Sequence, residues 1–89
     1  MRIVWDEPKR LANIAKHGLD FLDLRDQFEF DVAMIRPARP SQGRPRWRAV
    51  GMLKGGMVSV IFSLLGGEAI AVISLRPAHK KERAAYEQR

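Results

Sequence analysis

Residues 46–75, RWRAVGMLKGGMVSVIFSLLGGEAIAVISL, decide the fold. Residues 46–53 read as a strand whose side chains alternate between two faces, with both arginines on one of them. Residues 57–65 are almost continuously apolar, which indicates a central strand covered on both faces. A glycine pair on each side of this strand marks a hairpin turn, and residues 69–75 form the next strand. With a short strand over residues 32–35, we expect a four-stranded antiparallel sheet.

The alternation over residues 46–53 also separates two sets of side chains. Arg46 and Arg48 fall in one set, and Trp47 falls in the other. Because neighbouring residues of a strand point to opposite faces, we expect the two arginines to project together. Trp47 is interpreted as a core residue, so stacking of a nucleic-acid base on it is not expected.

The segment before the sheet predicts a strand and a helical hairpin. Residues 3–5 are a short apolar strand, and Asp6 after them is a typical helix N-cap residue. Gly18 can take the positive φ that ends a helix, so the first helix runs to about His17. Asp20 can cap a second helix, whose apolar residues recur at helical spacing: Phe21, Leu24 and Phe28.

Proline and glycine mark the remaining boundaries. Residues 37–45 contain three prolines and Gly43, a composition that predicts a loop. Pro77 opens a short C-terminal helix over residues 78–88. The chain therefore reads as one α+β domain over residues 1–89, with the helical hairpin and the last helix packed on one face of the antiparallel sheet.

Composition excludes several classes of site and protein. The 89 residues contain no cysteine, which rules out disulfides and thiolate chemistry, and only two histidines. No apolar run approaches the roughly 20 residues of a membrane span, and the first residues lack the apolar stretch of a signal peptide. We expect a cytoplasmic protein with no membrane contact, no metal site and no cofactor.

Positive charge is concentrated in the second half of the chain. The net charge is +6, and residues 46–89 hold eight basic against three acidic residues. No acidic residue lies between Asp31 and Glu68. Such a charge distribution favours an anionic partner, which could be nucleic acid, an acidic protein or an anionic surface, although a solvated basic face is the simpler alternative.

Candidate catalytic groups gather around the last helix. Glu82 and Tyr86 are one helical turn apart, and Arg76 ends the strand before them. With Arg46 from the sheet, they supply guanidinium groups for a phosphate, a carboxylate for a proton and a phenol to orient the site. These groups suffice in principle to cleave RNA without metal. The structural alternatives are a helix-dipole role for Glu82 and a packing role for Tyr86.

The first helix carries a polar stripe opposite its apolar face, formed by Lys9, Asn13, Lys16 and His17. A structural interpretation is available for His17, because a positive charge is favourable at the C-terminal end of a helix. From the residues alone, both interpretations stay open.

Three separated motifs resemble those of the BrnT toxin family. The first is Trp5-Asp6-x-x-Lys9 with Asn13, Lys16-His17-Gly18 and Phe21. The second is Arg46-x-x-x-Val50-Gly51. The third is Ile73-Ser74-Leu75-Arg76-x-Ala78, followed by Glu82-Arg83 and Tyr86. Three positions depart from the family pattern, namely Arg44, Leu75 and His79.

The resemblance implies a RelE-like fold and an endoribonuclease toxin of a type II toxin–antitoxin system, which inhibits translation and growth. It implies neutralisation by a BrnA-like antitoxin, in a complex of two copies each that binds operator DNA through the antitoxin. The RNA substrate could be ribosome-bound mRNA. The catalytic residues expected on this basis are Arg76, Glu82, Tyr86, Arg46 and His17, with the two arginines on the phosphate and Glu82 or His17 as proton acceptor. The expected RNA-binding residues are Lys9, Asn13, Lys16, Arg44, Arg48, Lys54 and Lys80.

A rival hypothesis is a non-catalytic module that binds nucleic acid or the antitoxin and acts as a co-repressor. A third is an orphan partner whose basic face only docks an acidic protein. Expression of the chain alone separates the leading hypothesis from these two, because only the toxin arrests growth.

Overall fold

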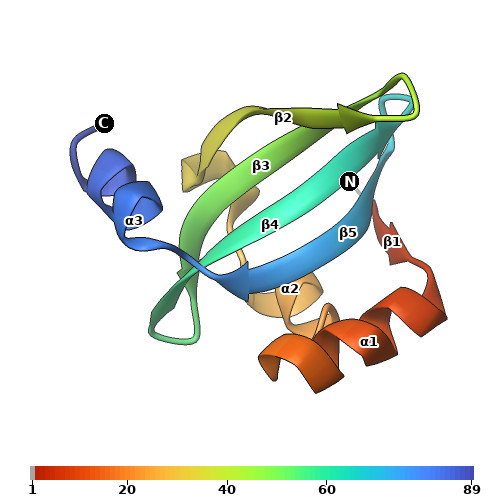
Figure 1. Ribbon diagram of the computed structural model, residues 1–89, viewed down its shortest axis with the longest axis horizontal. Helices are drawn as coiled ribbons and strands as arrows, with labels where there is room; N and C mark the ends of the chain where they lie inside the picture. Colours follow the sequence, from red (N-terminus) through yellow and green to blue (C-terminus); the bar gives the residue numbers. More distant parts are fainter. Residues whose placement is uncertain (1) are drawn as a thin grey trace.

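A computed structural model describes residues 2–89 as a five-stranded mixed sheet with helices on both faces (Figure 1). The elements are, in chain order, β1 (Arg2–Trp5), α1 (Glu7–His17), α2 (Leu22–Gln27), the 3-10 turn η1 (Phe30–Val32), β2 (Met34–Ser41), β3 (Arg44–Leu53), β4 (Gly56–Leu65), β5 (Ala69–Pro77) and α3 (Lys80–Glu87). The α+β class and the antiparallel order of β2 to β5 agree with the sequence-based prediction.

The sheet has one strand more than the predicted four. Its order is β1-β5-β4-β3-β2, and β1 pairs in parallel with β5 from Arg2↔Ala69 to Trp5↔Val72. Strand β1 is the edge strand beside β5, and β2 is the edge strand on the opposite side of the sheet. The helical hairpin between them carries the chain from one edge to the other. A strand's hydrophobic pattern does not specify its pairing partner, which is why the prediction missed this strand's place in the sheet.

The strand predicted over residues 32–35 exists but begins at Met34, and the predicted loop over residues 37–45 is wrong. Val32 lies in η1, and β2 extends to Ser41 despite two internal prolines. Proline is tolerated there because β2 is an edge strand with one side of its backbone unpaired. Gln42 and Gly43 form the turn to β3 with φ of 53° and 75°, the positive values that a tight two-residue hairpin requires.

The hydrophobic core lies between the sheet and the helical hairpin, on what we call the inner face. Phe21 and Leu24 are fully buried there against Ala49 and Leu53 of β3. Phe28 closes the core over Gly51, where an added Cβ would lie 3.1 Å from the phenyl ring. These contacts confirm the apolar face predicted for the second helix.

Helix α3 packs on the opposite face of the sheet, so the expectation that all helices share one face is wrong (Figure 1). Arg48 and Val50 of β3 line one hollow with Glu82 and Ala85 of α3, whereas their neighbour Ala49 points into the core. We call this second face, which bears Arg46, Arg48 and Arg76, the outer face. Helix α3 covers only part of it.

Local contacts set where the helices begin. The Ala78 N–H donates to Met57 O at 2.9 Å and prolongs the β4–β5 pairing, so α3 begins at Lys80 and not at residue 78. Helix α2 begins at Leu22, and its N-cap residue is Phe21 and not the predicted Asp20. The Asp20 carboxylate still accepts a hydrogen bond from the Leu22 N–H, the first of the helix. Within residues 2–89 no helix is long and apolar enough to cross a membrane.

Candidate active site

Three charged side chains from three elements meet on the outer face. Arg76 of β5 donates from Nη1 and Nη2 to the two carboxylate oxygens of Glu82 in α3, both at 2.8 Å. Arg48 of β3 lies 3.0 Å from Glu82 Oε2 through its Nη1 and also donates to the buried Ser59 hydroxyl. We call Arg48, Arg76 and Glu82 the arginine–glutamate cluster. The expected proximity of Arg76 and Glu82 is therefore present.

The cluster holds Glu82 in its ionised form. Hydrogen bonds from Arg76, with further contributions from His79 N–H and from the charges of Arg76 and Arg48, lower the pKa of Glu82 to about 2 although partial burial opposes the shift. A carboxylate with so low a pKa, and with both oxygens engaged, is a poor proton acceptor near neutral pH. Its geometry suits a different task, which is to hold two guanidinium groups in place.

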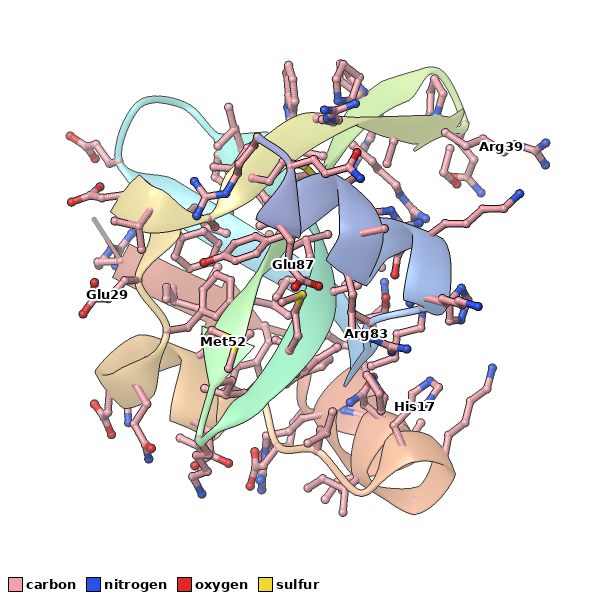
Figure 2. The ribbon with its side chains drawn as sticks, turned by 90° about the vertical axis from the view of Figure 1, so that its left-hand side faces the viewer. His17, Glu29, Arg39, Met52, Arg83 and Glu87 are labelled. Atoms are coloured by element: carbon pink, nitrogen blue, oxygen red, sulfur yellow. The ribbon has the colours of Figure 1, made fainter. Side chains whose placement is uncertain are left out.

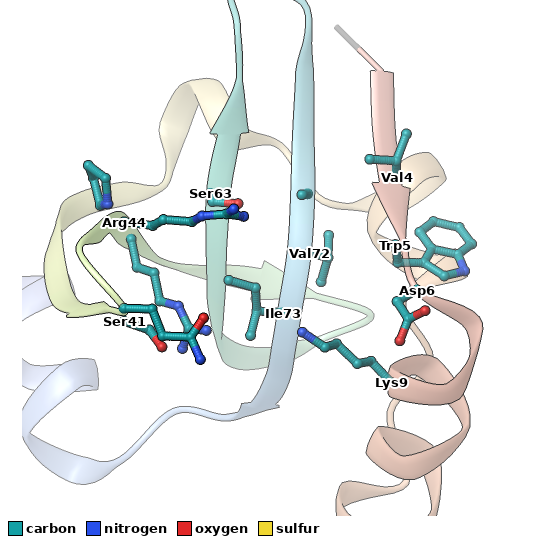
Figure 3. Close-up of a pocket in the computed structure, with 13 residues that line it drawn as sticks. Val4, Trp5, Asp6, Lys9, Ser41, Arg44, Ser63, Val72 and Ile73 are labelled. Carbon is teal, nitrogen blue, oxygen red and sulfur yellow. The ribbon is translucent and has the colours of Figure 1, made fainter.

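A cavity of about 510 Å³ opens beside the cluster, on the part of the outer face that α3 leaves uncovered (Figure 3). It lies between the start of α1, strand β5 and the β2–β3 hairpin. In Figure 3, Lys9 extends from α1 toward β5. Arg44 and Arg46 of β3 also line the cavity. We call this cavity the basic groove. Its other lining residues include Asp6, Ser41, Gln42 and Ser63.

Arg46 connects the basic groove with the cluster. It lines the groove and also a neighbouring hollow of about 300 Å³ that it shares with Arg39 and Arg48. Arg48 in turn lines the hollow beside Glu82. Arg46 and Arg48 therefore lie on the same face of the sheet and line adjoining hollows, as the alternation in the sequence predicted.

Asn13 has a structural role in place of the RNA contact expected for it. It is buried, and its amide donates to Leu75 O at 2.8 Å and to Leu19 O at 2.9 Å while accepting from Leu75 N–H at 3.0 Å. The amide pairs with β5 beyond the last residue of β1, much as the peptide group of another strand would. All of its hydrogen-bonding groups are thus used, and α1 is fastened along β5.

Because Asn13 attaches α1 to β5, it also determines where the other residues of the polar stripe, Lys9, Lys16 and His17, lie. Lys9, one turn before Asn13, lies at the basic groove. His17, one turn after Asn13, is half-buried and lines neither the basic groove nor the hollows around the cluster. In Figure 2, His17 lies on the same side of the molecule as Arg83 of α3. Lys16 is exposed and lines neither the groove nor the neighbouring hollows.

Lys54 lies away from this surface. It occupies the β3–β4 turn with a positive φ, and its Nζ is 3.1 Å from Asp23 Oδ1 of α2, beside the inner face. The structure therefore does not bring Lys54 together with the other expected RNA-binding residues. Lys80 is exposed in the first turn of α3.

Tyr86 is half-buried on α3, but within residues 2–89 its hydroxyl makes no hydrogen bond to Glu82 or Arg76. The Arg89 guanidinium covers the ring at 4.1 Å from its centre. Glu82 and Tyr86 therefore lie on the same helix, as predicted, but no hydrogen bond joins their side chains.

Sequence reasoning missed two residues of this surface, Asp6 and Ser59. Ser59 and Ser63 interrupt an otherwise apolar strand, and Ser59 pairs with Arg76 across the β4–β5 ladder, so its polarity was a usable signal. Arg39 was expected to steer RNA from a loop, and it lies instead in β2. Asp6 was assigned to helix capping, yet its side chain makes no capping hydrogen bond.

Comparison with known proteins gives the family. Residues 5–82 match the model of a family described as "Ribonuclease toxin, BrnT, of type II toxin-antitoxin system". The chain is also 48% identical to the Brucella abortus ribonuclease toxin BrnT, known from a crystal structure at 1.1 Å, with a TM-score of 0.76 over 90% of this chain and 99% of that one. None of the curated proteins compared matches it. The family match spans most of the chain and includes the first two motifs and the third as far as Glu82, while Arg83 and Tyr86 lie beyond it. This protein therefore belongs to the BrnT family of ribonuclease toxins of type II toxin–antitoxin systems.

Proposed function

We propose that this toxin is a RelE-like endoribonuclease that cleaves RNA on its outer face without a metal ion. The observation that carries the proposal is the position of Arg46 between the basic groove and the arginine–glutamate cluster. An RNA strand in the groove brings its phosphates past Arg46 and Arg48. Each guanidinium can donate two parallel hydrogen bonds to a phosphate, which makes arginine suited to this contact.

The reaction we propose is attack of a ribose 2′-OH on the adjacent phosphate. The O2′–P bond forms and the P–O5′ bond breaks, leaving a 2′,3′-cyclic phosphate and a 5′-hydroxyl. Arg46 and Arg76 stabilise the negative charge that develops on the phosphate oxygens. This stabilisation by fixed cations supports cleavage that needs no bound metal.

Proton transfer is assigned to His17, because the contacts of Glu82 suit it to positioning Arg76 and Arg48. An imidazole can accept the 2′-OH proton and return one to the leaving 5′-oxygen. The attachment of α1 to β5 through Asn13 supports this role, since it holds the helix that carries His17 against Leu75, the residue before Arg76. Tyr86 completes the proposed site as an orienting group. Lys9, Lys16, Arg44 and Lys80 are proposed to bind RNA phosphates.

The family supplies the proposed biological setting. A toxin–antitoxin system implies an antitoxin partner and an RNA substrate. We propose a BrnA-like antitoxin in a complex of two toxins and two antitoxins, which binds operator DNA through the antitoxin. The free toxin would then inhibit translation in the cytoplasm by cutting RNA, including mRNA on the ribosome.

Cleavage by the purified, antitoxin-free protein in EDTA tests the proposal. We expect the wild type to cut RNA and leave cyclic phosphate ends. Arg46→Ala should lose about 100- to 1,000-fold in rate, the usual cost of removing one donor that stabilises the transition state. Lys54→Ala is the matched control, because it removes one positive charge outside the outer face.

Two further outcomes bear on the proposal. An Arg76→Ala variant that remains fully toxic at wild-type expression would contradict its assigned role. Absence of cleavage with and without ribosomes, together with normal growth of cells that express the chain alone, would favour the co-repressor function.

A further inference from the structure

Asp6 is the one acidic side chain that lines the basic groove. It lies at the N-cap position of α1 with φ of −92° and ψ of 122°, where an aspartate usually accepts hydrogen bonds from the first helical N–H groups. Its side chain makes no such bond, and within residues 2–89 it makes no ion pair either. The neighbouring Glu7, by contrast, is paired with Arg10 at 2.6 Å. The Asp6 side chain thus lines the groove beside the start of α1 without a capping or ion-pair partner among the described residues (Figure 3).

A carboxylate in the path of a polyanion repels phosphate, so it lowers general affinity for RNA unless it makes a specific contact. Sequence-specific recognition of RNA uses unstacked bases, which are read on their Watson–Crick edges. Guanine presents two adjacent donors there, N1–H and the N2 amino group, which match the two acceptor oxygens of a carboxylate. Adenine, cytosine and uracil each place an acceptor beside their donor, and that acceptor faces a carboxylate oxygen unfavourably.

We propose that Asp6 binds the Watson–Crick edge of a guanine base seated in the basic groove, and so sets the sequence preference of the toxin. The inference rests on the proposed function, because it places RNA on the outer face. The cavity of about 510 Å³ lies within the range of roughly 300–1,000 Å³ that holds small ligands. Lys9 and Arg46, which line the same cavity, hold the phosphates on either side of this nucleotide.

The test measures binding, so it does not depend on cleavage. The probes are short single-stranded RNAs, 2′-O-methylated to block cleavage, that carry guanine, inosine or adenine at one central position. Inosine lacks only the N2 amino group. We expect the wild type to prefer guanine over inosine and over adenine by about tenfold to a hundredfold, the range that one bidentate base contact contributes.

Asp6→Asn is the informative variant, because asparagine caps a helix as well as aspartate does. It replaces one acceptor with a donor, so the amide can pair with O6 and N1–H of guanine or inosine as well as with the N6 amino group and N1 of adenine. We expect this variant to lose the difference between guanine and inosine and to lose most of its preference for guanine over adenine. Asp31→Asn removes the same charge from η1, outside the groove, and should leave the preference of the wild type unchanged.

Equal affinity of the wild type for guanine and inosine would overturn the proposal, as would an Asp6→Asn variant that keeps the wild-type preference. A toxin that binds the guanine probe selectively, yet cuts no RNA with or without ribosomes, would support this inference while refuting the proposed function. Cleavage of RNA without any selectivity for guanine would support the proposed function and refute this inference.

Discussion

Replacing Glu82 with glutamine removes one negative charge from between two guanidinium groups and preserves the length of the side chain. The pKa of Glu82 is lowered from 4.5 to about 2, and each unit of pKa difference corresponds to about 1.4 kcal/mol. The ionised carboxylate therefore stabilises the fold by about 3 kcal/mol, with little loss to solvent because the side chain is only 18% exposed. Glutamine keeps one acceptor oxygen, so we expect Glu82→Gln to lose about 2–3 kcal/mol at pH 7. This loss would lower Tm by about 10–20 °C in a domain of this size.

The effect depends on pH in a defined direction. Because the pKa is lowered in the folded state, the stabilisation is fully present above about pH 4.5 and is lost as the pH falls toward 2. Urea unfolding followed by circular dichroism at pH 7, 5 and 3 should show a difference between wild type and variant that shrinks at pH 3. Glu87→Gln, an exposed site on the same helix, is the control and should change stability by less than about 0.5 kcal/mol. A Glu82→Gln variant as stable as the wild type at pH 7, or a difference that stays constant down to pH 3, would refute this reasoning.

Three other substitutions test the structural roles of single residues. Asn13→Ala should cost about 3 kcal/mol or more in urea unfolding, because it leaves the buried N–H and carbonyl of Leu75 without their partner; a loss below 1 kcal/mol would argue against that role. Gly51→Ala should cost about 1–3 kcal/mol, since the new methyl group would meet the Phe28 ring at 3.1 Å, and an unchanged Tm would show that the ring gives way. Lys54→Ala should cost at most about 1 kcal/mol and leave RNA affinity in a filter-binding assay unchanged, because its ion pair is exposed and lies off the outer face; weaker RNA binding would contradict this placement.

The sequence predicted correctly those elements that are determined by neighbouring residues in the chain. Strands β3, β4 and β5 follow from alternation and from glycine turns, and α1 follows from its apolar face and Gly18. The parallel pairing of β1 and the position of α3 on the outer face depend on contacts between distant segments, which periodicity does not encode. The proline-rich β2 was taken for a loop because tolerance of proline depends on a strand's place at the edge of the sheet, and that place was unknown.

Some features of the candidate site could be predicted from the sequence, and others depend on the folded structure. Alternation placed Arg46 and Arg48 on one face, and the position of Arg76 just before the last helix predicted that it lies near Glu82. Residue type and charge alone do not show whether a polar side chain is exposed, so Asn13 and Lys54 were both expected to contact RNA. Whether Glu82 accepts a proton or holds arginines depends on the two guanidinium groups around it, which only the folded structure brings together.

The central claim is that the outer face cleaves RNA through its arginines, and one measurement tests it most directly. Purified toxin, freed of antitoxin, is incubated with RNA in EDTA beside the Arg46→Ala and Lys54→Ala variants, with circular dichroism to verify that each is folded. The account predicts cleavage by the wild type and by Lys54→Ala, and a rate about 100- to 1,000-fold lower for Arg46→Ala. Cleavage by Arg46→Ala at the wild-type rate, or none by the wild type even with ribosomes supplied, would contradict it.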